Sequence, residues 1–297
     1  MAERKLLILG VDGGGTRSRA RLCAYSGRLL GEAVSGPANL RLGIEASFSS
    51  VLDAARQCLA AAGIAPEGVS RMVACLALAG ASEPGHLDAA RQHRHPFRAA
   101  VITTDAHAAC VGAHDGRDGG VIIAGTGAVA WATINGKTYR IGGWGLPVSD
   151  EGSGAWLGSE VLRRVLWAYD GRIAWTPLLR AVFADFSNDP HAIVGWTASA
   201  SPRDFGAFAP RVADYARNED REAVELMQLA AAHIDSLAAR LIALGVPRLS
   251  LVGGLAVALQ PWLAPHTTSC LVQPAGDAVD GALRLARSAA QSLQDVA

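Results

Sequence analysis

The chain lacks both a long hydrophobic run and an excess of charge of either sign. Its 297 residues include 27 basic and 27 acidic side chains, so the formal net charge is zero. No apolar run approaches the ~20 residues of a membrane-spanning helix, and residues 1–5 lead into an apolar segment without a signal-peptide core. Without a basic field, nothing holds nucleic acid or an anionic membrane nonspecifically. We therefore expect a cytoplasmic protein that binds neither nucleic acid nor membranes and has a small molecule as its ligand.

Cysteine is scarce and scattered. Five cysteines occur singly among apolar neighbours, with no C-x-x-C pair and no metal-ligand spacing, namely Cys23, Cys58, Cys75, Cys110 and Cys270. We expect them to be reduced core residues. His93 and His95 do not suggest a zinc site, because the cysteines and carboxylates that it needs are missing nearby.

Apolar residues make up 50% of the chain, which is enough to fill two cores. One hydrophobic core stops growing at roughly 250–300 residues, and many domains are about half that size. The length therefore predicts two domains.

The segment Leu6–Thr16 joins an apolar run to three glycines, with Asp12 before them and Thr16 after them. Gly13, Gly14 and Gly15 lack a Cβ, so their N–H groups can approach an anion, while Asp12 can reach a metal or its water shell. A tight hairpin turn is the alternative. A P-loop would need Lys in place of Thr16, and a dinucleotide fingerprint would need a helix next. The following residues 19–25 alternate as a strand does, so the loop joins two strands of a hairpin.

The order of the predicted elements repeats once along the chain. We expect a three-stranded meander over 6–34, a helix from Ile44, strands over 72–79 and 99–104, and Asp105 at a strand end. The pattern restarts with strands over 120–124, 129–134 and 137–141, and its first turn is Gly125–Thr126–Gly127. Later come a helix over 221–244, a strand over 248–252 that runs into Gly253–Gly254, a strand around 270–272 and a helix from about Asp277. Each copy opens with a glycine and threonine turn.

Polar side chains in loops complete the set of candidate residues. Residues 142–153 are too polar and glycine-rich for a core element, so we expect an exposed, shaped loop. Asn39 and Asp150 have several hydrogen-bonding groups suited to a polyol, but a turn residue and a helix N-cap are their alternative roles. Asp105 has the same alternative as an N-cap for a helix that starts at Ala106.

These features resemble the sugar kinase, actin and Hsp70 superfamily, and within it the BadF/BadG group that contains the glucosamine and N-acetylglucosamine kinases. The resemblance runs from about Leu6 to Ala286 and depends on five motifs in order, which are 10–16, 104–106, 124–127, 142–145 with 150–153, and 253–254. Segments 35–39, 76–81, 110–114 and 202–206 look like bacterial glucosamine kinases, whereas Gly142–Gly145 is more similar to N-acetylglucosamine enzymes. This mixture leaves the substituent on the sugar open.

The resemblance implies an α/β fold of two RNase H-like, actin-like ATPase domains with an interdomain cleft. Residues 1–116, completed by a C-terminal helix at about 280–297, would form the first domain and residues 117–279 the second. It also implies a homodimeric kinase that uses ATP and Mg²⁺ to phosphorylate the 6-OH of glucosamine or N-acetylglucosamine. The catalytic base would be Asp105, which also contacts the sugar, and Asp12 would hold magnesium through water. The phosphates would meet Gly13, Gly14, Gly15, Thr16, Thr126 and Gly127, the adenosine Gly253 and Gly254, and the sugar Asn39, Gly143, Trp144, Gly145 and Asp150.

Two other functions occur on the same fold. One is the ATPase that activates acyl-CoA dehydratases through an iron–sulfur cluster held by cysteines at a dimer interface, and this chain offers no closely spaced cysteine pair. The other is a non-catalytic sugar sensor or repressor, which usually carries a DNA-binding helix pair ahead of the first strand. Only five residues precede that strand here, so we do not expect the repressor. The missing cysteine pair leads us not to expect the ATPase either.

Overall fold

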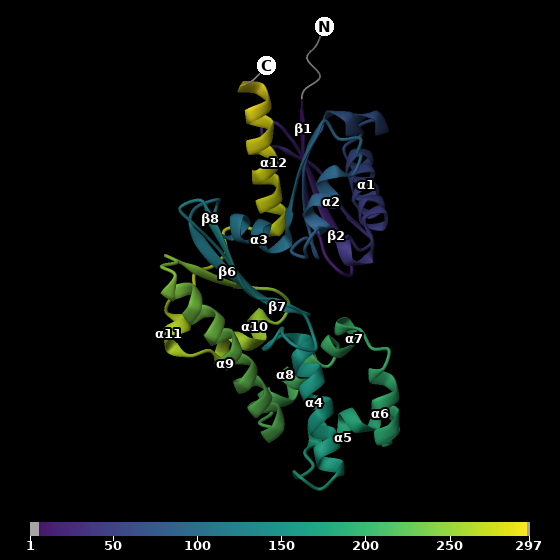
Figure 1. The fold of residues 1–297 in the computed structure, drawn as a ribbon, viewed down its shortest axis with the longest axis vertical. Coiled ribbons are helices and arrows are strands. Elements are labelled where there is room, and N and C mark those ends of the chain that lie inside the picture. The colour runs from purple at the N-terminus through teal and green to yellow at the C-terminus, as the bar shows by residue number, and fades with distance from the viewer. Residues whose placement is uncertain (1–5, 296–297) are drawn as a thin grey trace. The chain divides into compact units, whose positions relative to one another are not determined.

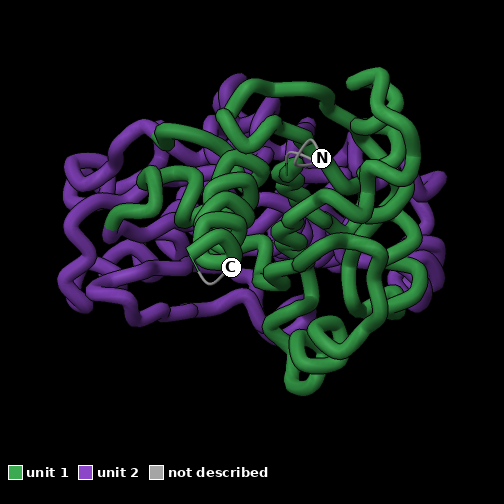
Figure 2. The backbone as a smooth tube through the Cα atoms, turned by 90° about the horizontal axis from the view of Figure 1, so that it is seen from above, with its two compact units in different colours: residues 1–117, 274–297 green, residues 118–273 purple. Residues whose placement is uncertain are grey.

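The structure is a computed structural model that describes residues 6–295, so residues 1–5, where we expect no signal-peptide core, lie outside the described range. The chain forms two compact units, of which unit 1 runs to Arg117 and resumes at Pro274, while unit 2 is Asp118–Gln273 (Figure 2). Our expected second boundary at 279 is therefore too late. The reason is local, because the Ala275 N–H donates to the Ala113 carbonyl at 2.9 Å and so ties the returning chain to unit 1. Within 6–295, no helix combines the length and apolar character needed to span a membrane.

Unit 1 is built on a five-stranded mixed sheet with the order β3-β2-β1-β4-β5. The strands are β1 Leu7–Gly13, β2 Ser18–Ala24, β3 Leu29–Ser35, β4 Met72–Leu78 and β5 Ala99–Thr104. β1, β2 and β3 pair antiparallel as the expected meander, whereas β4 and β5 continue the sheet in parallel with β1. Gly13 aligns with Leu78, and Leu78 aligns with Thr104. The carboxyl ends of the three parallel strands therefore meet at one edge.

Helices cover both faces of this sheet (Figure 1). α1 Ile44–Ala61 packs its buried stripe, which includes Phe48 and Val51, on one face. α12 Ala278–Asp295 and α3 Asp105–Ala113 cover the other. A Cβ on Gly281 would lie 1.9 Å from the Ala108 carbonyl oxygen, so only glycine lets α12 approach α3 this closely. Short elements complete the unit, namely η1 Leu40–Leu42, η2 Pro66–Arg71 and α2 His86–Gln92.

Unit 2 is built on a four-stranded sheet with the order β8-β7-β6-β9. Its strands are β6 Gly119–Ala124, β7 Ala128–Ile134, β8 Lys137–Gly142 and β9 Leu249–Val252, with β9 parallel to β6. The strand expected around 270–272 is wrong, because this segment makes only a single bridge between Leu271 and Leu249. Pro274 follows almost at once and has no N–H with which to continue a ladder.

The helices of unit 2 share one hydrophobic core with the buried residues of β6 and β7. They are α4 Gly154–Tyr169, α5 Pro177–Ala184, α6 Pro190–Thr197, α7 Pro202–Gly206, α8 Ala209–Arg217, α9 Arg221–Ala243, α10 Ala256–Leu259, η3 Gln260–Trp262 and α11 Pro265–Thr268. A buried ion pair between Arg164 and Glu222 joins α4 to the first turn of α9. The several short helices expected over 177–218 and the long one after them are present.

The cysteines lie largely where composition predicts. Cys23, Cys58, Cys75 and Cys110 are buried free thiols, and Cys270 is half-buried. Burial raises the pKa of the Cys75 thiol to about 12, so this thiol is protonated and unreactive at neutral pH.

Candidate active site

In unit 1, the first glycine turn joins β1 to β2. The Gly14 N–H donates to the Arg17 carbonyl at 3.0 Å and closes the turn, and Gly15 and Thr16 at its tip are exposed. A Cβ on Gly13 would lie 2.7 Å from the Ala38 carbonyl oxygen, so this position needs glycine for close packing. The predicted hairpin is thus confirmed, and its tip leaves backbone amides where an anion can reach them.

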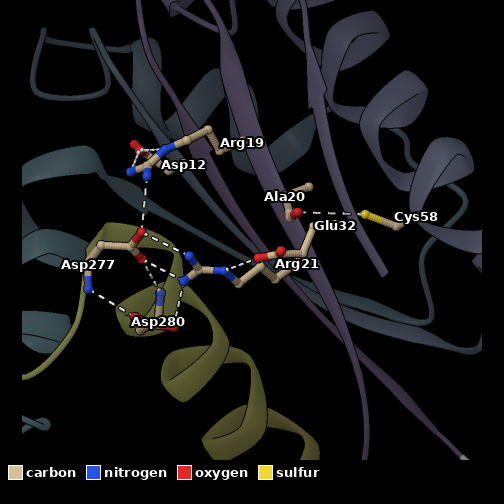
Figure 3. Close-up of polar contacts among 8 residues, drawn as sticks. All are labelled: Asp12, Arg19, Ala20, Arg21, Glu32, Cys58, Asp277 and Asp280. Carbon is tan, nitrogen blue, oxygen red and sulfur yellow. Dashed lines mark hydrogen bonds and ion pairs between the residues drawn. The ribbon is translucent and has the colours of Figure 1, made fainter. Parts of the chain in front are cut away.

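Asp12 precedes this turn and lies beside Arg19 of β2 (Figure 3). Arg19 donates to the Asp12 Oδ2 atom from Nη2 at 2.8 Å and from Nε at 3.3 Å. Within residues 6–295, no side chain donates to the Oδ1 atom. One carboxylate oxygen is therefore fixed and the other is left to bind a ligand.

Asn39 lies next to the same turn and caps η1. Its Oδ1 atom accepts from the Arg41 N–H at 3.0 Å, so the turn role that we set as its alternative is present. A Cβ on Gly15 would lie 3.5 Å from the Asn39 Nδ2 atom, and this amide nitrogen donates to no other side chain or backbone atom between residues 6 and 295. The two roles use different atoms of the side chain, because the oxygen holds the turn while the nitrogen lies near the glycines.

Asp105 is the first residue of α3, not its N-cap. Thr104 caps the helix, since its Oγ1 atom accepts from the His107 N–H at 3.0 Å. The Asp105 Oδ1 atom accepts from the Ala106 N–H at 2.8 Å, which orients the carboxylate at the end of β5. The alternative role of Asp105 as a cap is therefore wrong. Because β1, β4 and β5 are in register, Asp12, Asn39 and Asp105 all follow or flank carboxyl ends at the same sheet edge.

His107 stands two residues after Asp105 and was missed by the sequence analysis. Its Nδ1 atom lies 2.8 Å from the Thr103 Oγ1 atom, and burial lowers the pKa of the imidazole. The ring is therefore neutral at physiological pH. A threonine followed four residues later by a histidine at a strand end is too common in proteins to have marked His107 as a site residue.

In unit 2, the second glycine turn joins β6 to β7. The Gly154 N–H donates to the Gly125 carbonyl at 2.8 Å, and the Ala155 N–H donates to the Thr126 carbonyl at 3.1 Å. These amides belong to the first turn of α4, which Ser153 caps through a hydrogen bond from the Trp156 N–H. The start of α4 thus fixes the backbone of this turn.

The Gly253–Gly254 pair lies against the same turn. Gly253 has a φ of 104°, and a Cβ there would lie 2.3 Å from the Ala124 carbonyl oxygen. The Leu255 N–H donates to that carbonyl at 3.0 Å. The parallel pairing of β6 with β9 brings together the two glycine motifs, which are more than a hundred residues apart in sequence.

Asp150 is the third member of this cluster in unit 2. It has a φ of 66°, unusual for a residue other than glycine, and its Oδ1 atom accepts from the Gly145 N–H at 3.1 Å. A Cβ on Gly127 would lie 2.6 Å from its Oδ2 atom. The helix N-cap role that we set as its alternative is wrong, because Ser153 caps α4.

Trp144 lies in the same glycine-rich loop with 67% of its surface exposed. The Arg140 guanidinium lies 4.2 Å from the ring centroid, and Arg140 also donates to the carbonyls of Gly142 and Gly143. Sequence reasoning missed Arg140, because an arginine in an alternating strand is most often a solvated surface residue. It covers one face of the indole, so a ligand can meet only the other.

Comparison with known proteins places this geometry in a family. The model of the BadF/BadG/BcrA/BcrD ATPase family matches residues 9–282. The chain belongs to this family. It is 41% identical over 278 residues to the glucosamine kinase GspK of Vibrio cholerae serotype O1, an alignment that covers 94% of this chain and 95% of that protein.

Solved structures with this fold align with almost the whole chain. A protein from Chromobacterium violaceum, provisionally assigned as an N-acetylglucosamine kinase, matches with a TM-score of 0.90 and 34% identity, covering 95% of this chain and 99% of that one. The activator of the 2-hydroxyisocaproyl-CoA dehydratase from Clostridium difficile matches with a TM-score of 0.52 and 13% identity over 98% of both chains, which shows a shared fold alone. The expected α/β fold of two actin-like ATPase domains is confirmed.

Membership of this ATPase family makes ATP the nucleotide of the chain. Within residues 6–295, no group of three or more His, Cys, Asp or Glu side chains is arranged to hold a metal ion. Mg²⁺ bound to a nucleotide needs no such group, because water and phosphate oxygens fill most of its positions and one or two carboxylates complete them. The Oδ1 atom of Asp12, which Arg19 leaves uncovered, fits that requirement.

Proposed function

We propose that this protein is an ATP-dependent amino-sugar kinase that transfers the γ-phosphoryl group of ATP to the 6-OH of glucosamine or N-acetylglucosamine. The observation that carries the proposal is the register of β1, β4 and β5, which sets the glycine turn, Asn39 and Asp105 at one sheet edge. The glucosamine kinase GspK, 41% identical over nearly the full length of both chains, supports the substrate class.

Catalysis of phosphoryl transfer depends mostly on positioning the two reactants in line and on neutralising phosphate charge. In our proposal the amides of Gly13, Gly14 and Gly15 and the Thr16 hydroxyl receive phosphate oxygens. Asp12 holds Mg²⁺ through water, and this ion supplies charge neutralisation when it is bound. Asp105 accepts the proton of the attacking hydroxyl, and its fixed orientation at the start of α3 suits that role.

The cluster in unit 2 is our candidate for the remaining substrate contacts. Thr126 and Gly127 would contact phosphates, while Gly253 and Gly254 would let the adenosine approach backbone, since a side chain on Gly254 would enter open space. Gly143, Trp144, Gly145 and Asp150 would contact the sugar, and Asn39 is the candidate sugar contact in unit 1. The contact between Asp150 and Gly145 supports this grouping.

We expect glucosamine to be the better substrate because of the identity to GspK. N-acetylglucosamine is the second candidate, and the stacking of Arg140 on Trp144 favours it. A guanidinium beside the indole disfavours a protonated sugar amine there, whereas a neutral acetamido group can pack on the free face of the ring. A single aromatic contact contributes about 0.5–1.5 kcal/mol, which corresponds to roughly a factor of ten.

A coupled ADP-release assay over a panel of hexoses and amino sugars tests the function. We expect release only with amino sugars, and Asp105→Asn should retain less than about a tenth of the rate, since general base catalysis contributes ~10²–10⁴-fold. Asp88→Asn is the matched control, because Asp88 is 75% exposed on α2. ADP release that ignores sugar would instead favour the dehydratase-activating ATPase. Sugar binding without any ADP release would favour a sensor.

The same assay separates the two amino sugars. If wild type prefers N-acetylglucosamine by more than about a hundredfold and Trp144→Ala removes that preference, the glycine-rich loop sets specificity and our substrate order is wrong. We also propose a cytoplasmic homodimer, and sedimentation equilibrium of the purified chain measures the oligomeric state.

A further inference from the structure

We propose that Arg19 is a positioning residue, which fixes the Asp12 carboxylate so that only its Oδ1 atom is presented to Mg²⁺. The inference rests on the proposed function in one respect, the assignment of the magnesium to Asp12. It goes beyond that function by identifying the residues that hold the Asp12 carboxylate in place. This support consists of Arg19 in β2, Asp277, and Asp280 in α12.

The first contact of this support is two-pronged. The Arg19 Nε and Nη2 atoms both donate to the same Asp12 oxygen, Oδ2, at 3.3 and 2.8 Å (Figure 3). Two donors from one rigid planar group restrict the position of that oxygen more than a single point charge does. The Oδ1 atom is left out of this contact and accepts a hydrogen bond from no other side chain between residues 6 and 295.

The far side of Arg19 is held in turn by Asp277. The Arg19 Nη1 atom donates to Asp277 Oδ2 at 3.0 Å. Arg21 donates to both oxygens of Asp277, at 2.9 and 3.2 Å. All three donor nitrogens of Arg19 therefore have carboxylate acceptors, and the guanidinium cannot rotate without losing one of them.

Asp277 is itself fixed by the start of α12. The Asp280 N–H donates to Asp277 Oδ1 at 3.0 Å, and the Asp277 N–H donates to Asp280 Oδ2 at 3.0 Å. This reciprocal pair has the geometry of a capping box. Arg21 is also bound to Glu32 of β3 at 2.6 Å, so the support ends on two separate elements of unit 1.

Two possible roles of Arg19, orienting Asp12 and offsetting negative charge, predict opposite changes in Mg²⁺ affinity when Arg19 is removed. Four carboxylates, Asp12, Asp277, Asp280 and Glu32, surround two guanidinium groups, Arg19 and Arg21. If Arg19 only offset this negative charge, its removal would bring Mg²⁺ closer to an unscreened carboxylate and tighten binding. If Arg19 orients Asp12, its removal frees the carboxylate to rotate and weakens binding. Supporting residues behind a metal ligand typically contribute 10–100-fold to metal affinity.

The test compares ADP with and without Mg²⁺ by thermal denaturation and needs no sugar or turnover. In wild type we expect ADP with EDTA to raise the Tm and ADP with Mg²⁺ to raise it further. In Arg19→Met the first shift should persist, while the Mg²⁺ concentration that gives half of the second shift rises about tenfold or more. Arg19→Lys should resemble Arg19→Met, because an ammonium keeps the charge but lacks the planar fork whose separate nitrogens reach Asp12 and Asp277.

Two further variants complete the design. Arg28→Met is the matched control, since Arg28 is exposed in the β2–β3 turn, and its Mg²⁺ dependence should equal that of wild type. Asp277→Asn should weaken the Mg²⁺ response in the same direction, and combining it with Arg19→Met should add little, because both act through one contact. The proposal is overturned if Arg19→Met tightens or leaves unchanged the Mg²⁺ response, or if wild type shows no Mg²⁺-dependent shift. Sugar turnover is measured separately, so failure of the kinase proposal would appear there and not here.

Discussion

Gly127 allows a direct test of how its neighbours in unit 2 hold Asp150. A Cβ at this position would lie 2.6 Å from the Asp150 Oδ2 atom and 3.3 Å from its Cγ atom. An ordinary contact starts at 3.4 Å, so in Gly127→Ala the carboxylate has to retreat by roughly 0.8 Å in a close-packed surrounding. The retreat is opposed, because Asp150 already has a φ of 66° and its other oxygen is bound to the Gly145 N–H.

Two effects of this substitution differ greatly in size. Gly127 does not have a positive φ, so alanine fits its backbone, and we expect the free energy of unfolding to change by less than about 1 kcal/mol. In contrast, if Asp150 binds the sugar as we propose, its displacement by nearly 1 Å can cost on the order of 10–100-fold in rate. We therefore expect kcat/KM for glucosamine to fall by that factor in a protein of nearly normal stability.

The measurement is kcat/KM for the sugar at saturating ATP, together with urea unfolding. Gly195→Ala on exposed α6 is the control, because nothing lies within 4 Å of its added Cβ. If Gly127→Ala raises only the KM for ATP and leaves the sugar parameters alone, the substitution acts through the phosphate contact proposed for Gly127 alone, and our reasoning about Asp150 is wrong. Fully additive effects of Gly127→Ala and Asp150→Asn would refute the reasoning as well, since residues in contact should couple.

Two other predictions concern stability. Arg164→Met should lower the free energy of unfolding in urea by up to about 3–5 kcal/mol, because the 2%-exposed Glu222 carboxylate loses its buried partner and keeps only the exposed Arg221. Arg163→Met on the exposed face of α4 should change it little. The pKa of Asp277 is lowered, since burial alone would raise it but the Asp280 N–H, Arg21 and Arg19 outweigh burial. A carboxyl group with a lowered pKa stabilises the folded state at pH values above its pKa in the unfolded chain. This contribution should be lost as the pH falls below about 4. In a series of Tm measurements against pH, Asp277→Asn should therefore lose less than wild type.

Local sequence signals predicted the parts of the fold that depend on neighbouring residues. The alternation after Thr16 correctly predicted the β1–β2 hairpin, and apolar runs ending in glycine predicted β4 and β9. The failures depend on distant partners. Residues 270–272 have the composition of a strand, but whether they pair beyond one bridge depends on where Pro274 takes the chain.

Local chemistry also left ambiguities that only geometry removed. Thr104 and Asp105 are both good N-caps, so their order alone did not say which would cap α3. The structure gives the cap to Thr104 and moves Asp105 one position into the helix. The same happened in the glycine-rich loop, where Ser153 and not Asp150 is the cap of α4. In both cases a hydroxyl side chain caps the helix, and the nearby carboxylate to which we assign a function does not.

Arg19 and Arg140 show what sequence patterns cannot reveal about a site. Each stands in a strand that alternates polar and apolar residues, where the pattern predicts only which face is polar. Arg19 acquires its meaning from Asp277, 258 residues away in sequence, and from the rotamer that it imposes on Asp12. Arg140 acquires its meaning from a tryptophan four residues later that folds back over it. Glycine and carboxylate motifs predict where a phosphate site lies, because their chemistry is intrinsic, whereas the residues that orient them are defined only by their partners in the folded chain.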